Sequence, residues 1–155
     1  MNRYPLTFRH VTTVFGRGYV ARVHLDGQAL AEEDEESVAI YGVHPGAIAE
    51  VGRSVKGAFQ GFADRLRLYY FDVANDAADF DAFRSEVERF FRECDDETIA
   101  EWESARAEVR AGRVELAGVP RDANARAPGV EVTLVVLEPA ANRVEKRTVR
   151  PLVAA

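Results

Sequence analysis

The segment from residue 41 to residue 58 constrains the fold of this chain more than any other stretch. It reads Tyr-Gly-Val-His-Pro-Gly-Ala-Ile-Ala-Glu-Val-Gly-Arg-Ser-Val-Lys-Gly-Ala. The order predicts a strand that ends at Pro45-Gly46 and resumes briefly at Ala47-Ile48. Gly52-x-Ser54 then begins a helix, because a serine hydroxyl accepts a hydrogen bond from a first-turn amide. The fold therefore joins a sheet directly to a helix.

The chain before this segment has the alternating pattern of a β-hairpin. The ranges Phe8 to Phe15 and Tyr19 to Leu25 flank Gly16-Arg17-Gly18, whose glycines allow the positive φ angles of a short loop. Alternate residues of the second range are apolar, which predicts that one face of this strand belongs to the core. If the hairpin is symmetric about Arg17, the first strand contributes Val11, Thr13 and Phe15 to that same face.

A third strand is predicted after an acidic stretch. Asp26-Gly27 is expected to end the second strand, because aspartate and glycine favour turns. The run from Glu32 to Glu36 has five consecutive carboxylates and is expected to form a loop in solvent. The third strand follows from Ser37 to Val43.

Three amphipathic helices are predicted after the glycine-serine junction, because apolar residues recur there at spacings of three and four. The apolar stripe of the first consists of Val55, Phe59, Phe62, Leu66, Tyr69 and Val73. The second helix, from about Asp79 to Cys94, has a stripe of Phe80, Phe83, Val87, Phe90 and Cys94. The third begins after Asp95 or Asp96 and buries Ile99, Trp102, Ala105 and Val109.

The tail returns to strand character. Val130 to Leu137 is rich in β-branched residues, and Val144 to Val149 alternates apolar with charged side chains. A turn at 139–142 would join the two into a C-terminal β-hairpin. The predicted fold class is α+β, a mostly antiparallel sheet with three helices packed on one face and this hairpin at the end. At 155 residues the chain is expected to be a single domain, with a core over 1–111 and a loop and hairpin extension over 112–155.

Composition excludes several classes of function. The formal net charge is −6, which argues against direct contact with nucleic acid, because phosphate binding requires clustered Lys and Arg. No apolar run approaches the ~20 residues that cross a bilayer, and the N-terminus has no signal-peptide core. The single cysteine, Cys94, rules out an internal disulfide framework and suits a reducing cytoplasm, where we expect the protein.

The three histidines form one candidate site. Symmetry about Arg17 places His10 opposite His24, and a second reflection, about Asp34, would place His24 beside His44. Three imidazoles in a row could bind a divalent metal and leave a fourth position open. The competing interpretation is that all three are ordinary residues of the sheet surface.

Other polar residues show no catalytic arrangement. The carboxylates of Asp72, Asp76 and Asp79 surround a helix junction, where they are expected to cap helix ends. Cys94 lies on an apolar stripe, so burial is the expected role of its thiol. We therefore assign no residue to catalysis and expect no cofactor.

The face opposite the predicted core also carries apolar side chains. They are Phe8, Val14, Val20, Val38 and Ile40. With all three helices on the other side, this face stays open unless the C-terminal segment or a second subunit covers it. A large exposed apolar patch usually marks an interface, so a homo-oligomer is expected.

One family resemblance is carried by short motifs between residues 8 and 70. These are Gly18-Tyr-Val-Ala-Arg-Val-His-Leu-Asp26, then Pro45-Gly46, then Gly52-x-Ser54-x-x-Gly57-Ala58. The pattern resembles HicB-like antitoxin domains, although Gly57 stands where that family has Glu. The resemblance implies a small α/β protein that oligomerises and binds a toxin-like protein partner.

Three hypotheses follow for function. The first is a non-enzymatic, oligomeric protein-interaction module that resembles a HicB-type antitoxin domain. The second is a small metal-dependent enzyme that uses the histidine cluster. The third is a scaffold within a larger complex, which composition does not distinguish from the first.

Overall fold

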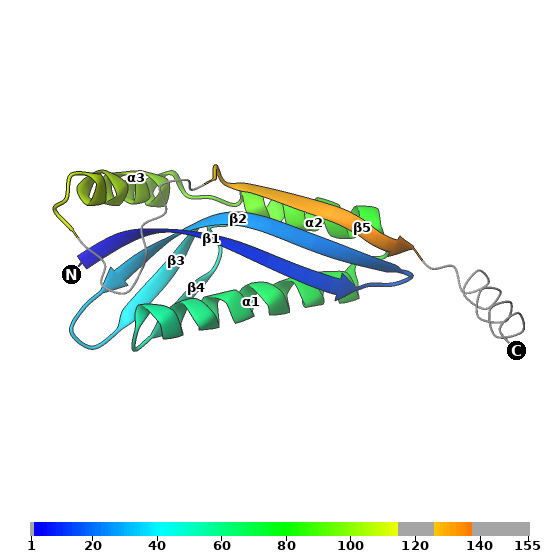
Figure 1. Ribbon diagram of the computed structural model, residues 1–155. Coiled ribbons are helices and arrows are strands. Elements are labelled where there is room, and N and C mark those ends of the chain that lie inside the picture. The colour runs from blue at the N-terminus through cyan, green and yellow to red at the C-terminus, as the bar shows by residue number, and fades with distance from the viewer. Residues whose placement is uncertain (1, 115–125, 138–155) are drawn as a thin grey trace, which may run out of the picture.

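The structure is a computed structural model that describes residues 2–114 and 126–137 (Figure 1). Its elements, in chain order, are β1 Asn2–Phe15, β2 Tyr19–Glu33, β3 Val38–His44, β4 Ala49–Gly52, α1 Val55–Asp76, α2 Phe80–Arg92, α3 Asp96–Arg110 and β5 Gly129–Leu137. All strand pairs are antiparallel, which confirms the predicted α+β class. The second strand of the predicted C-terminal hairpin, 144–149, lies outside the described residues.

Strand β2 is the centre of the sheet. One of its edges pairs with β1 along nearly the whole strand, from Asn2↔Glu33 to Phe15↔Val20. Its other edge is shared, because residues 19–26 pair with β5 and residues 28–33 pair with β3. Strand β4 then pairs with β3 and leads into α1. The junction that the sequence predicted between sheet and helix is present, with Ser54 as the N-cap of α1.

The β1–β2 hairpin has a shorter loop than predicted. The Gly16 amide donates to the Tyr19 carbonyl over 2.9 Å, so the loop is Arg17-Gly18 and only Gly18 has a positive φ, of 77°. The centre of the hairpin therefore lies between these two residues, and the predicted symmetry about Arg17 is wrong by one position. A shift of one residue moves every side chain of a strand to the other face. On β1, Val14 is consequently buried and Phe15 exposed.

Strand β2 also continues past the predicted stop at Asp26-Gly27. Gly27 lies opposite Phe8, whose ring occupies the space that a Cβ at Gly27 would fill. The glycine thus admits an aromatic ring into the core instead of ending the strand. The chain turns only at Asp34, whose Oδ1 accepts hydrogen bonds of 2.8 Å from the amides of Glu36 and Ser37.

Helices α1 and α2 cover one face of the sheet, which we call the covered face. Ser54 Oγ accepts from the Gly57 amide, and Asp79 Oδ1 accepts from the Ala82 amide, so both helices begin at the predicted caps. The core between helices and sheet is rich in aromatic rings. Its largest fully buried side chains include Tyr70, Phe62, Phe83, Leu25, Ile40 and Leu66.

Helix α3 packs on the opposite face, which corrects the prediction of three helices on one side. Its Trp102 and Ala105 form a separate buried cluster with Leu30 of β2 and Val43 of β3. The Trp102 indole also donates to the Leu6 carbonyl of β1 over 3.2 Å. Leu30 alternates along β2 with Ala29 and Ala31 of the main core, so it points to the other side. Figure 1 shows α1 and α3 on opposite sides of the sheet.

Candidate interaction surface

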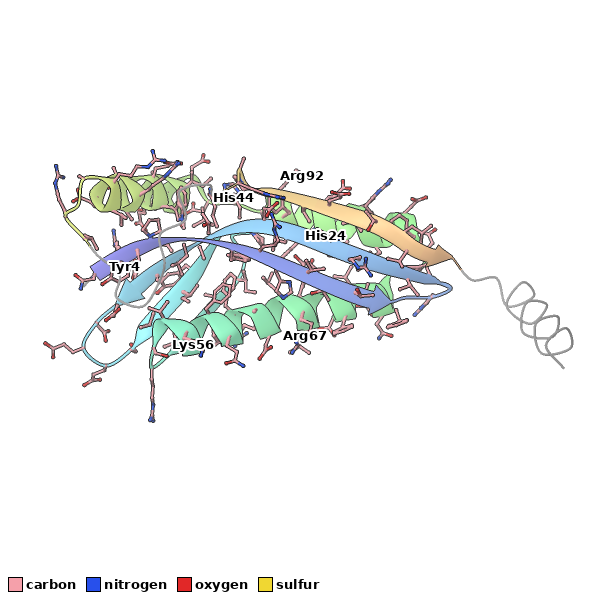
Figure 2. All side chains as sticks on the ribbon, viewed as in Figure 1. Tyr4, His24, His44, Lys56, Arg67 and Arg92 are labelled. Atoms are coloured by element: carbon pink, nitrogen blue, oxygen red, sulfur yellow. The ribbon has the colours of Figure 1, made fainter. Side chains whose placement is uncertain are left out.

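The structure separates the three histidines of the predicted metal site. His10 lies opposite Leu25 and faces α1, whereas His24 lies opposite Val11 and is exposed on the other face. His44 lies opposite Gln28, four residues along β2 from His24. In Figure 2, His24 and His44 occupy clearly separate places on the sheet.

The predicted histidine row is therefore wrong for two reasons. The hairpin register is shifted by one residue, and the pairing of β2 with β3 places His44 opposite Gln28 instead of His24. Among residues 2–114 and 126–137, no group of three His, Cys, Asp or Glu side chains could hold a metal ion. His10 instead belongs to the packing under α1. Its Nδ1 lies 3.2 Å from Thr12 Oγ1, its ring centroid lies 6.3 Å from that of Tyr70, and burial lowers its pKa.

His44 has a partner that sequence reasoning missed. Its Nδ1 lies 2.9 Å from Cys94 Sγ, and the Gly46 amide donates to the Glu93 carbonyl over 2.8 Å. These contacts join the turn after β3 to the linker between α2 and α3. Burial raises the pKa of the Cys94 thiol and lowers the pKa of His44, so both groups favour their neutral forms. A neutral thiol is a weak nucleophile, and the pair is best described as a structural contact.

Four of the five predicted interface residues lie in the main core. Val14 and Ile40 are fully buried, Val38 is buried, and the Phe8 ring packs edge-on against Phe59 and Phe62. The prediction that these residues form an exposed face is wrong. The fifth residue, Val20, is half-buried on the face away from α1 and α2.

We call the face of β1 and β2 that α1, α2 and α3 leave uncovered the open face. The exposed apolar residues on it are not the predicted ones. Phe15 is 75% exposed and lies opposite Val20, while Val11 is 48% exposed and lies opposite His24. A polar pair lies between them, in which Arg22 Nε donates to Thr13 Oγ1 over 3.3 Å. A second pair follows on the far side of Val11, with Arg9 Nε 3.1 Å from Asp26 Oδ1. The open face thus alternates exposed apolar side chains with polar pairs, and protein interfaces commonly contain both kinds of group.

The signal for Val11 and Phe15 was present in the sequence, because both belong to the alternation of β1. The predicted register placed them in the core, whereas the observed register places them in solvent. By contrast, no local pattern indicates the contact between His44 and Cys94, which lie fifty positions apart in the chain.

None of the described helices is long and apolar enough to cross a membrane. Comparison of the chain with protein-family models, with curated proteins and with solved structures finds no match.

Proposed function

We propose that this protein is a non-enzymatic, oligomeric protein-interaction module that acts through its open face. The observation that carries the proposal is the exposure of Phe15 and Val11 on a face of β1 that none of the described helices covers. Exposed aromatic and β-branched side chains gain free energy when a partner removes them from water. Aromatic residues are among those that most often dominate binding at protein interfaces.

The resemblance to HicB-type antitoxin domains is part of this proposal. It is supported by the order of β1, β2, β3, the Pro45-Gly46 turn and the Ser54-capped helix α1, which is the order of the motifs. A toxin-like protein is accordingly the proposed partner besides further copies of the chain. We also propose a cytoplasmic location, because Cys94 is a free thiol.

The structural roles of the candidate chemical residues support a non-enzymatic function. His10 of β1 packs against Tyr70 of α1, and His44 contacts Cys94. Each of these groups is engaged in holding an element in place. The exposed polar side chains near Phe15, such as Arg22, bond to neighbouring strands.

The test is the molar mass in solution at micromolar concentration, measured by light scattering after size-exclusion chromatography. We expect the unmodified protein to be an oligomer and Phe15→Glu to weaken its association at least about tenfold, because the charge would be buried in the interface. Leu68→Glu is the matched control, since Leu68 is 59% exposed on α1 and away from the open face. It should leave the oligomer intact.

Two results would contradict the proposal. One is an unmodified protein that is strictly monomeric at these concentrations. The other is an equal loss of association in Phe15→Glu and Leu68→Glu, because the open face would then not be the specific site of association. Circular dichroism of both variants checks that each retains its fold.

A further inference from the structure

The outer edge of β1 is protected along only part of its length. Within residues 2–114 and 126–137, β1 pairs with no strand other than β2, so its second edge is unpaired. Arg3, Pro5 and Arg9 lie along its first part, and charges and proline are the usual means of preventing edge-to-edge pairing. The last five residues, Val-Thr-Thr-Val-Phe over 11–15, contain neither. This end of the edge is suited to pairing with another strand.

The same five residues are complementary to themselves. In an antiparallel pair with a two-fold axis at Thr13, Val11 of one copy lies opposite Phe15 of the other, and the two Thr13 residues face each other. Aromatic residues opposite β-branched ones, and threonine opposite threonine, are stabilising cross-strand pairs. A two-fold axis perpendicular to the sheet keeps residues of the open face together, so all these contacts form on one side. If the two-fold axis lay nearer the N-terminus of β1, Arg9 would be among the residues paired between the two copies.

Helix α1 carries a second exposed aromatic residue at the same level. It runs alongside β1 (Figure 1), with Phe8 packed against Phe59 and Phe62. One strand residue advances about as far as two helical residues, so Thr13 is level with about residue 71. Phe71 is 40% exposed and lies one turn after Arg67 (labelled in Figure 2), a residue close enough to His10 to affect its pKa. Residues four apart share one side of a helix, so Phe71 lies on the side that borders β1.

We propose that two copies of this chain form a symmetric dimer by antiparallel pairing of β1 with β1 around Thr13, with the two Phe71 side chains beneath the junction. The occupant is a second copy because the unprotected segment matches itself in side-chain type and in register. This inference rests on the proposed function and names the partner, the edge and the alignment of the strands.

Disulfide cross-linking at defined positions tests the alignment. In a Cys94→Ala background, Thr13→Cys places two thiols opposite each other, within the distance that a disulfide requires. We expect mild oxidation at micromolar protein concentration to yield at least about tenfold more covalent dimer than Leu68→Cys in the same background, because effective concentration governs the yield. Val11→Cys and Phe15→Cys should cross-link poorly alone and efficiently when mixed.

The outcomes separate this inference from the proposed function. If Thr13→Cys cross-links no better than Leu68→Cys while the protein still oligomerises through Phe15, the β1 alignment is wrong and the interaction module stands. If Val11→Cys alone cross-links best, the two-fold axis lies elsewhere and the stated register is overturned. If the Cys94→Ala parent and the unmodified protein are both monomeric by light scattering, both proposals fail.

Discussion

The two faces of the sheet are built by the same strands and differ in what covers them. The covered face holds the main core, where Phe62 of α1 and Phe83 of α2 are fully buried. The other face has a small cluster around Trp102 of α3 and leaves Phe15 in solvent. Apolar side chains of β1 and β2 therefore lie on both faces of the sheet. Those that a helix covers are buried in a core, and the others remain exposed.

The largest expected effect on stability comes from creating a cavity in the core of the covered face. Phe62→Ala should lower the free energy of unfolding by about 3–5 kcal/mol, because the ring is fully buried against Phe8 and Phe59. Chemical denaturation monitored by circular dichroism measures it. Leu68→Ala, on the exposed side of the same helix, is the control and should change stability by less than about 0.5 kcal/mol. Equal effects of the two variants would show that α1 does not cover the core.

A substitution in the cluster under α3 should lower the free energy of unfolding by a smaller amount. Trp102→Phe keeps an aromatic ring and removes the indole N–H that donates to the Leu6 carbonyl. We expect a loss of about 1–2 kcal/mol from the missing hydrogen bond and the smaller ring, measured by the same denaturation. A loss as large as that of Phe62→Ala would mean that both faces contribute equally to stability.

The pH dependence of stability offers a smaller test of the covered face. Burial is the main cause that lowers the pKa of His10 below the ordinary value of 6.5, with Arg67 adding to it against opposing effects of Ala63 and Asp64. The unfolded chain then takes up a proton more readily than the folded one. The contribution of His10 is thus complete above 6.5 and is lost as pH falls from there through the folded pKa. His10→Gln should reduce the decline of unfolding free energy over this range. An unchanged slope in denaturation at several pH values would contradict the burial of His10.

The smallest expected effect on folding lies on the open face. Phe15→Ser should change the unfolding free energy of the monomer by less than about 0.5 kcal/mol, because most of the ring is in solvent. Denaturation at concentrations below those of association measures this. A loss comparable to that of Phe62→Ala would show that the ring is covered within its own chain.

Much of this fold follows from local pattern. Ser54, Asp79 and Asp95 each accept a hydrogen bond from the amide three residues later, and the helices begin where these capping residues predict. The core face of β2 is also as predicted, since Tyr19, Val23 and Leu25 are buried. These features depend on neighbours within a few residues, which is the range over which sequence pattern is informative.

The candidate site could not be predicted to the same extent, because it depends on strand register. A loop of two residues instead of three moves Phe15 from core to solvent and Val14 in the opposite direction. Hairpin loops of two and of three residues both accommodate glycine, so the sequence Gly16-Arg17-Gly18 does not decide the loop length. The position of α3 likewise depends on Leu30 and Val43, which are distant from Trp102 in the chain.

The shared edge of β2 has a consequence for how the chain is made. Residues 19–26 are synthesised before the three helices, whereas their partner β5 follows all three. Asp26 and its pairing partner Gly129 are therefore separated by most of the described chain. Before β5 is present, a long stretch of β2 backbone has one unpaired edge beside Val23 and Leu25, and such edges are prone to pairing with other chains. We therefore expect the nascent protein to be prone to aggregation until β5 has been synthesised. Slower translation of the segment after α3 should lengthen this interval.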